Sequence, residues 1–149
     1  MSPSAGSSIT HRYVSIVRIV GYLVFLAAFF LPAVREPGHQ DTFQGSFCAG
    51  VTLINTFHRE FWHNINFLSI LSGWINPLML LYVASLFSRR LAMFRRIVAV
   101  IIALFLVGTW VYFYLVPLVP LVGHFCWVAG IAMILAGEAL PRTQPPQVA

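Results

Sequence analysis

The chain carries little charge and contains no lysine. Of its 149 residues only 9% are charged, whereas soluble domains have about 25%. All nine basic residues are arginines and gather at the ends of apolar runs, a placement typical of membrane orientation rather than of nucleic-acid binding. The arginine-only basic set, with much alanine and valine, indicates a GC-rich genome and hence a bacterium. We therefore expect a bacterial membrane protein without a nucleic-acid partner.

Motifs that carry chemistry are also scarce. There is no Cys-x-x-Cys pair, no phosphate-binding glycine loop and no nucleophile elbow, and no Asp, Glu, Lys or Arg lies in the middle third of an apolar run. These absences disfavour a thiol oxidoreductase and a proton-coupled pump. His58 and His63 are five residues apart, about 140° around a helix, so they do not form the zinc-protease pair of HExxH. We expect no catalytic residue and no cofactor.

Four apolar segments reach the length of about 20 residues that a helix needs to cross a bilayer. Their approximate bounds are 14–34, 65–87, 97–116 and 121–140. They predict an all-α membrane protein, a four-transmembrane-helix bundle forming one domain over 1–149, with disordered tails at 1–8 and 142–149. A cleavable signal peptide is the alternative for the first segment, but bulky Phe29 and Phe30 and the lack of a small-x-small site favour a span.

The arginines predict the orientation of these spans. An inner N-terminus places seven of them inside and two outside, which satisfies the positive-inside rule. The inner set is Arg12, Arg18, Arg89, Arg90, Arg95, Arg96 and Arg142, and the outer set is Arg35 and Arg59. The expected location is therefore the bacterial inner (plasma) membrane, with several passes and both termini cytoplasmic.

The outer loop 35–64 is too long to lack structure in a compact domain. Apolar residues recur in it every three or four positions, which predicts an amphipathic helix that lies on the outer face or caps the bundle. They are Phe43, Phe47, Val51, Ile54, Phe57 and Phe61, and the opposite face carries Gln44, Thr52, Asn55 and Arg59. A short hairpin is the alternative, because 51–57 is rich in β-forming residues and Gly45 and Gly50 would interrupt a helix.

The second span contains a polar face that is the candidate intramembrane site. Polar and small residues spaced at three and four share this face and should point into the bundle. The candidate site comprises Asn66, Ser69, Ser72, Gly73, Asn76 and Pro77. Pro77 lacks an N–H for the carbonyl of Gly73, so we expect a kink with a free carbonyl beside the Asn76 amide. The alternative interpretation is a packing face with one interhelical hydrogen bond.

The fourth span has a stripe of small residues at heptad spacing. Gly123, Cys126, Gly130 and Gly137 allow another helix backbone to approach closely. We expect this helix-packing face to meet the second span or the first, where Gly21 and Ala28 are also seven apart, or to recruit a partner subunit.

Two further groupings lie on the predicted outer side. Cys48 and Cys126, the only cysteines, would form a disulfide if their Cα atoms lie within about 7 Å, and are small packing residues otherwise. The four histidines His39, His58, His63 and His124 would bind a metal if they converge, although nothing in their spacing brings them together. The prediction is that no metal is bound.

Two short motifs resemble those of small bacterial four-span inner-membrane proteins of unassigned activity. They are Phe30-Leu31-Pro32-Ala33 at the end of the first span and Trp74-Ile75-Asn76-Pro77-Leu78 in the second. The resemblance implies a four-helix layout, with Pro32 and Asn76-Pro77 as structural signatures, and implies no activity.

Three functional hypotheses follow from the sequence. The first is a non-enzymatic accessory or scaffolding subunit of a bacterial inner-membrane complex, whose partners are the lipid bilayer and other membrane subunits or further copies of itself. The second is a small oligomeric transporter or channel for a neutral solute, with a midplane site around Asn76-Pro77. The third is a periplasm-facing metal or thiol protein.

Overall fold

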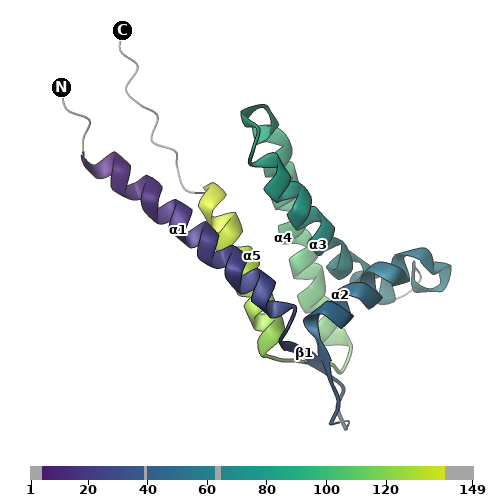
Figure 1. Ribbon diagram of the computed structural model, residues 1–149. Helices are drawn as coiled ribbons and strands as arrows, with labels where there is room; N and C mark the ends of the chain where they lie inside the picture. Colours follow the sequence, from purple (N-terminus) through teal and green to yellow (C-terminus); the bar gives the residue numbers. More distant parts are fainter. Residues whose placement is uncertain (1–4, 39, 63–64, 140–149) are drawn as a thin grey trace.

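The computed structural model describes residues 5–38, 40–62 and 65–139, with side chains for 14–38, 40–62, 65–88 and 90–136. Helices dominate this part of the chain (Figure 1). The α-helices are α1 (Ala5–Ala28), α2 (Gly45–Ile54), α3 (Asn66–Ser85), α4 (Ala92–Leu115) and α5 (Val122–Ala139). Short 3-10 helices are η1 (Asn55–Phe57), η2 (Arg59–Trp62) and η3 (Arg89–Leu91), and the strands are β1 (Pro32–Arg35), β2 (Thr42–Gln44) and β3 (Val119–Pro120). Residues 5–8, for which the sequence indicates a disordered tail, begin α1; residues 142–149 lie outside the described part.

The long helices form two pairs that diverge from a common end. α1 packs along α5 and α3 along α4, and Figure 1 shows the pairs close together near β1 and separated at the opposite end. A buried apolar cluster joins all four helices. Its members are Phe25 of α1, Ile75, Met79 and Tyr82 of α3, Val98 and Ile102 of α4, and Ile131 and Ile134 of α5. The pairs are therefore held together by branched and aromatic side chains rather than by close backbone contact.

Glycines allow α1 and α5 to approach closely. A Cβ atom on Gly130 would lie 2.7 Å from the backbone nitrogen of Phe25, and one on Gly21 would lie 3.1 Å from the carbonyl oxygen of Gly130. Gly123 similarly lies against the carbonyl of Leu31, where α1 has ended. The small-residue face expected on the fourth span thus lies against the first helix of the same chain.

A small antiparallel sheet, in the order β2-β1-β3, lies at the end where the pairs meet. Val34 pairs with Phe43 on one side and with Pro120 on the other. Gly38, at φ +86°, lies in the connection between β1 and β2, a backbone conformation that glycine adopts without strain. The prediction of an all-α chain is wrong here, because Pro32 ends the first helix early and the chain pairs in short strands before α2 begins.

The helix predicted for the outer loop is present, and part of its polar side packs on the bundle. α2 and η1 cover 45–57, and the amides of Gly45 and Ser46 donate to the carbonyls of Leu31 and Phe29 at 3.0 and 2.9 Å. These bonds satisfy donors that the first turn of a helix leaves unpaired. Thr52 packs on Gly73 of α3, whereas Ile54 and Phe57 are 58% and 83% exposed. Of the predicted polar side, Thr52 and Asn55 thus face the bundle, whereas Gln44 and Arg59 are exposed.

α3 and α4 are long and apolar enough to cross a membrane. The apolar stretches found in the described parts of α1 and α5, Val14–Ala28 and Val122–Ala136, are shorter. Successive long helices alternate in direction, so that the start of α1, the α3–α4 connection and the end of α5 lie at the end away from the sheet (Figure 1).

Candidate functional site

A cavity of about 310 Å³ lies at the sheet end of the bundle, between α2, α3, α4, α5 and β1. Its walls combine aromatic rings with neutral polar groups. The polar and sulfur-bearing side chains are Cys48, Thr52 and Asn55 of α2 and η1, Ser69, Ser72 and Asn76 of α3, Thr109 and Tyr112 of α4, and His124 of α5; Glu36 lies at the exposed rim. Small-molecule sites are concave and mostly apolar with a few placed polar groups, and this cavity has that character.

The polar face expected on the second span divides into two parts. Ser69, Ser72 and Asn76 line the cavity, because positions three, four and seven apart fall on one side of a helix. Asn66, Gly73 and Pro77 do not line it. Gly73 is instead the crossing point of α2, where a Cβ atom would lie 2.7 Å from the hydroxyl oxygen of Thr52. Pro77 lies inside α3 without ending it, and the expected kink stays a prediction.

One hydrogen bond at the cavity links the two helix pairs. The indole Nε1 of Trp127 on α5 donates to Oδ1 of Asn76 on α3 at 3.0 Å. An indole only donates, so the amide oxygen of Asn76 must face Trp127 and the NH₂ group must point away from it. The sequence indicates that Asn76 faces the interior, but contains no signal for this partner, which is 51 residues away.

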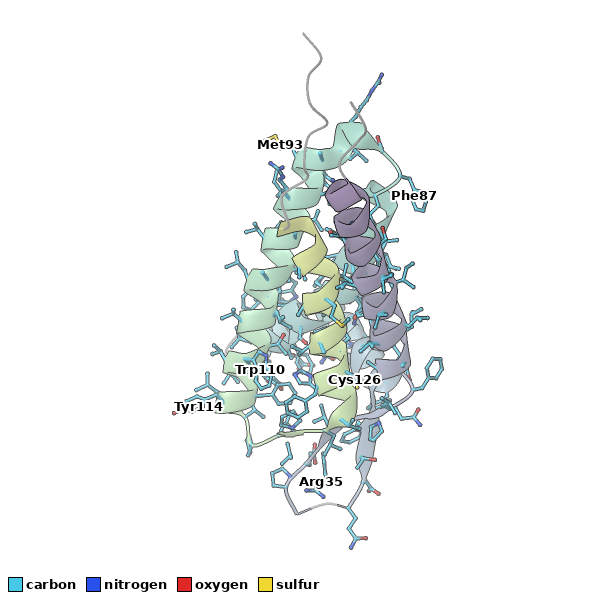
Figure 2. All side chains as sticks on the ribbon, turned by 90° about the vertical axis from the view of Figure 1, so that its left-hand side faces the viewer. Arg35, Phe87, Met93, Trp110, Tyr114 and Cys126 are labelled. Atoms are coloured by element: carbon cyan, nitrogen blue, oxygen red, sulfur yellow. The ribbon has the colours of Figure 1, made fainter. Side chains whose placement is uncertain are left out.

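His124 is buried in the wall of the site and surrounded by aromatic rings. It is 6% exposed, and its ring centroid lies 4.5 Å from that of Phe113, 5.4 Å from that of Trp110 and 5.6 Å from that of Trp127. Its Nε2 has no hydrogen-bond partner among the residues that the structure describes. Figure 2 shows the aromatic side chains gathered beside Trp110, while Tyr114, one turn further along α4, projects outward. A buried ring nitrogen without a partner is costly, which makes this corner a place for a ligand group to approach.

The contribution of α2 to the cavity is absent from the sequence prediction. Thr52 and Asn55 belong to the polar face of the predicted amphipathic helix, and both line the cavity. The signal that could have found them is their spacing with Cys48, at four and seven residues, which places all three on one helix face. The rule that polar residues of a helix in lipid face inward would have indicated that these three residues face the bundle.

The two cysteines are not bridged, which leaves the alternative of two unpaired residues in place of a disulfide. Both thiols are free. Cys48 turns into the cavity from α2, whereas Cys126 lies on α5 and does not line the cavity (Figure 2). Burial raises the pKa of the Cys48 thiol above its ordinary value, although a backbone hydrogen bond opposes the shift. Because less thiolate forms at neutral pH, Cys48 is a poor nucleophile. We therefore interpret it as a small residue of the cavity wall.

The four histidines do not all meet in the described structure. His39 and His63 lie outside the described residues, His58 is exposed after η1, and His124 is enclosed in the cavity wall. Among the described residues no three His, Cys, Asp or Glu side chains converge in a way that would hold a metal ion. The site residues present are thus suited to hydrogen bonding and stacking rather than to metal chemistry.

Comparison of the chain with protein-family models, with curated proteins and with solved structures finds no match in any of the three.

Proposed function

We propose that the chain is a four-span integral membrane protein that binds a small neutral molecule in the cavity at the outer end of its bundle. The cavity carries this proposal: Ser69, Ser72 and Asn76 of α3 converge with Thr52 and Asn55 of α2 and η1 on one half-open space. Binding there would be the recognition step of a small carrier or channel for a neutral solute.

Exposed apolar surface supports the embedding in a membrane. Only 17% of the most apolar 18-residue stretch of α4 is buried. The outward side of this helix is a continuous apolar stripe. The stripe comprises Ile97, Val100, Leu104, Val107 and Val111, and α1 presents Ile16, Ile19, Leu23 and Leu26 in the same way. Soluble monomers rarely expose apolar patches of this extent, whereas lipid solvates them. The outward Ile54 and Phe57 of α2 fit the same environment.

The distribution of arginines supports four spans with both termini inside. Figure 2 shows Phe87 and Met93 at the end of the bundle opposite Arg35. Arg90 and Arg96 follow these two residues by three positions each in the chain. The alternating direction of the long helices brings the arginine-rich connection 88–91 to the end where α1 starts and α5 finishes. The positive-inside rule then assigns that end to the cytoplasm and the cavity to the outer side of the inner membrane.

The cavity also favours binding over a purely structural role. The glycine face of α5, which would suit a partner subunit, already lies against α1 through Gly130. A role as an accessory subunit stays a hypothesis, and it gives no reason for polar side chains of α2, α3 and α4 to face one cavity.

Replacing Asn76 by leucine should weaken binding of a neutral probe. We expect saturable binding of 4-fluoroacetophenone to the wild-type protein in lipid nanodiscs, followed by ¹⁹F NMR against protein-free discs. The probe's carbonyl would accept from the Asn76 amide, so Asn76→Leu should bind it about tenfold more weakly. Asn66→Leu is the matched control on the same helix, because Asn66 does not line the cavity. Equal loss in both variants, or no saturable binding at all, would contradict the proposal.

A further inference from the structure

Three of the five hydroxyl groups on the cavity wall offer it only acceptors. Those of Ser72 and Tyr112, which make no hydrogen bond among the described residues, can both donate and accept. Thr52 Oγ1 donates to the carbonyl of Cys48 at 2.8 Å, Ser69 Oγ to that of Asn66 at 2.7 Å, and Thr109 Oγ1 to that of Phe105 at 2.9 Å. A hydroxyl has one hydrogen and two lone pairs. Because the hydrogens of these three hydroxyl groups are used within their own helices, α2, α3 and α4 present oxygen lone pairs to whatever enters.

Asn76 offers the opposite kind of group. Its Oδ1 is occupied by the indole of Trp127, so its NH₂ group supplies the donors. That amide has no other hydrogen-bond partner in the part of the chain that the structure describes. The cavity thus combines an oriented donor on α3 with acceptors on three helices around it.

Formal charge is nearly absent from the walls. Glu36 is the one Asp, Glu, Lys or Arg side chain among the described lining residues, and it is exposed at the rim. An ion taken into such a cavity would lose its hydration without gaining a counter-charge, which is strongly unfavourable. A neutral molecule with unequal polar ends has no such cost.

We infer that the ligand is a small neutral molecule whose polar end carries both a hydrogen-bond acceptor and donors beside an apolar ring or chain, the chemistry of a primary carboxamide. This inference rests on the proposed function and specifies the ligand class for the same site. The carbonyl of such a ligand accepts from Asn76, its NH₂ group donates to the wall hydroxyls, and its apolar body lies among the rings of Phe113 and Trp127.

Three probes of nearly the same shape separate the contributions. 4-Fluorobenzamide has the acceptor and the donors, 4-fluoroacetophenone replaces the NH₂ group by a methyl group, and 4-fluorobenzoate adds a charge. Binding to the full chain in nanodiscs is measured by ¹⁹F NMR against protein-free discs. We expect the amide to bind about five- to tenfold more tightly than the ketone, and the benzoate to bind at least tenfold more weakly than the amide.

Removing the wall acceptors should abolish this preference. The combined variant Thr52→Val, Ser69→Ala, Ser72→Ala, Thr109→Val and Tyr112→Phe removes all five hydroxyl groups of the wall and nearly keeps its shape, so the ketone should still bind while the advantage of the amide disappears. Ser85→Ala with Thr42→Val is the control. Ser85 donates to the carbonyl of Tyr82 on its own helix, and neither residue lines the cavity.

The outcomes are distinguishable. Ketone binding without an amide preference overturns this inference and leaves the proposed function standing. An amide preference that survives in the combined variant, or benzoate binding as tight as that of the amide, also overturns the inference. Failure of all three probes to bind the wild-type protein overturns the proposed function and this inference with it.

Discussion

Replacing Leu104 by arginine should prevent stable insertion of the chain into a membrane. Leu104 lies near the middle of α4 and is 64% exposed on its outward side. In lipid, an arginine at the centre of a helix costs about 2.5–3.5 kcal/mol on insertion scales. If water covered this face, the same substitution would change stability by no more than about 0.5 kcal/mol. The membrane-integrated fraction after alkaline extraction of membranes measures the difference.

Phe87→Arg is the control for this substitution. Phe87 is 90% exposed, but it lies at the turn between α3 and α4. An arginine there would reach the membrane–water interface, beside the arginines that the proposed orientation places on the cytoplasmic side. We expect its integrated fraction to equal that of the wild-type chain. Leu104→Arg integrating as well as Phe87→Arg would mean that α4 does not face lipid.

Replacing Gly130 by alanine should destabilise the protein, while the same change at Gly50 should not. A Cβ atom on Gly130 would meet backbone atoms of Phe25 at 2.7 and 2.8 Å, so α1 would have to move away from α5. Overpacking of this kind costs about 1–3 kcal/mol. Gly50 lies in α2 with nothing within 4 Å of the same position, and alanine there gains about 0.8–1 kcal/mol of helix propensity.

Thermal unfolding in mild detergent, followed by size-exclusion chromatography of the heated samples, compares the two variants. We expect a lower unfolding midpoint than that of the wild-type protein for Gly130→Ala, and an equal or higher midpoint for Gly50→Ala. A decrease of the same size in both unfolding midpoints would contradict the close contact of α1 with α5.

The sequence indicates helices wherever long apolar runs occur, because hydropathy integrates over many residues. The core segments of α3 and α4 follow directly from it. The sheet escapes such reasoning, because strands of four, three and two residues carry no alternating pattern of useful length. Pairing such as that of Val34 with Pro120 depends on the approach of two helix ends that are distant in the chain.

The candidate site was predictable on one helix and not on its neighbours. The spacing of Ser69, Ser72 and Asn76 identifies a shared face of α3 from local geometry alone. The hydrogen bond from Trp127 and the enclosure of His124 depend on how α4 and α5 pack, which local spacing does not encode. The amphipathic pattern predicts the helix α2 but not which of its residues meet the bundle, and the contact of Thr52 with Gly73 depends on how α2 crosses α3.

The most direct test of the central claim is to place a single cysteine at each end of the helix bundle and ask which side of the membrane it faces. In a Cys48→Ala, Cys126→Ala background, Gln40→Cys lies at the sheet end and Ser88→Cys at the α3–α4 connection. A membrane-impermeant maleimide is applied to intact bacterial spheroplasts expressing each variant. With the proposed orientation, we expect labelling of Gln40→Cys in intact spheroplasts and of Ser88→Cys only after the membrane is permeabilised. Labelling of both, or of neither, in intact spheroplasts would contradict it.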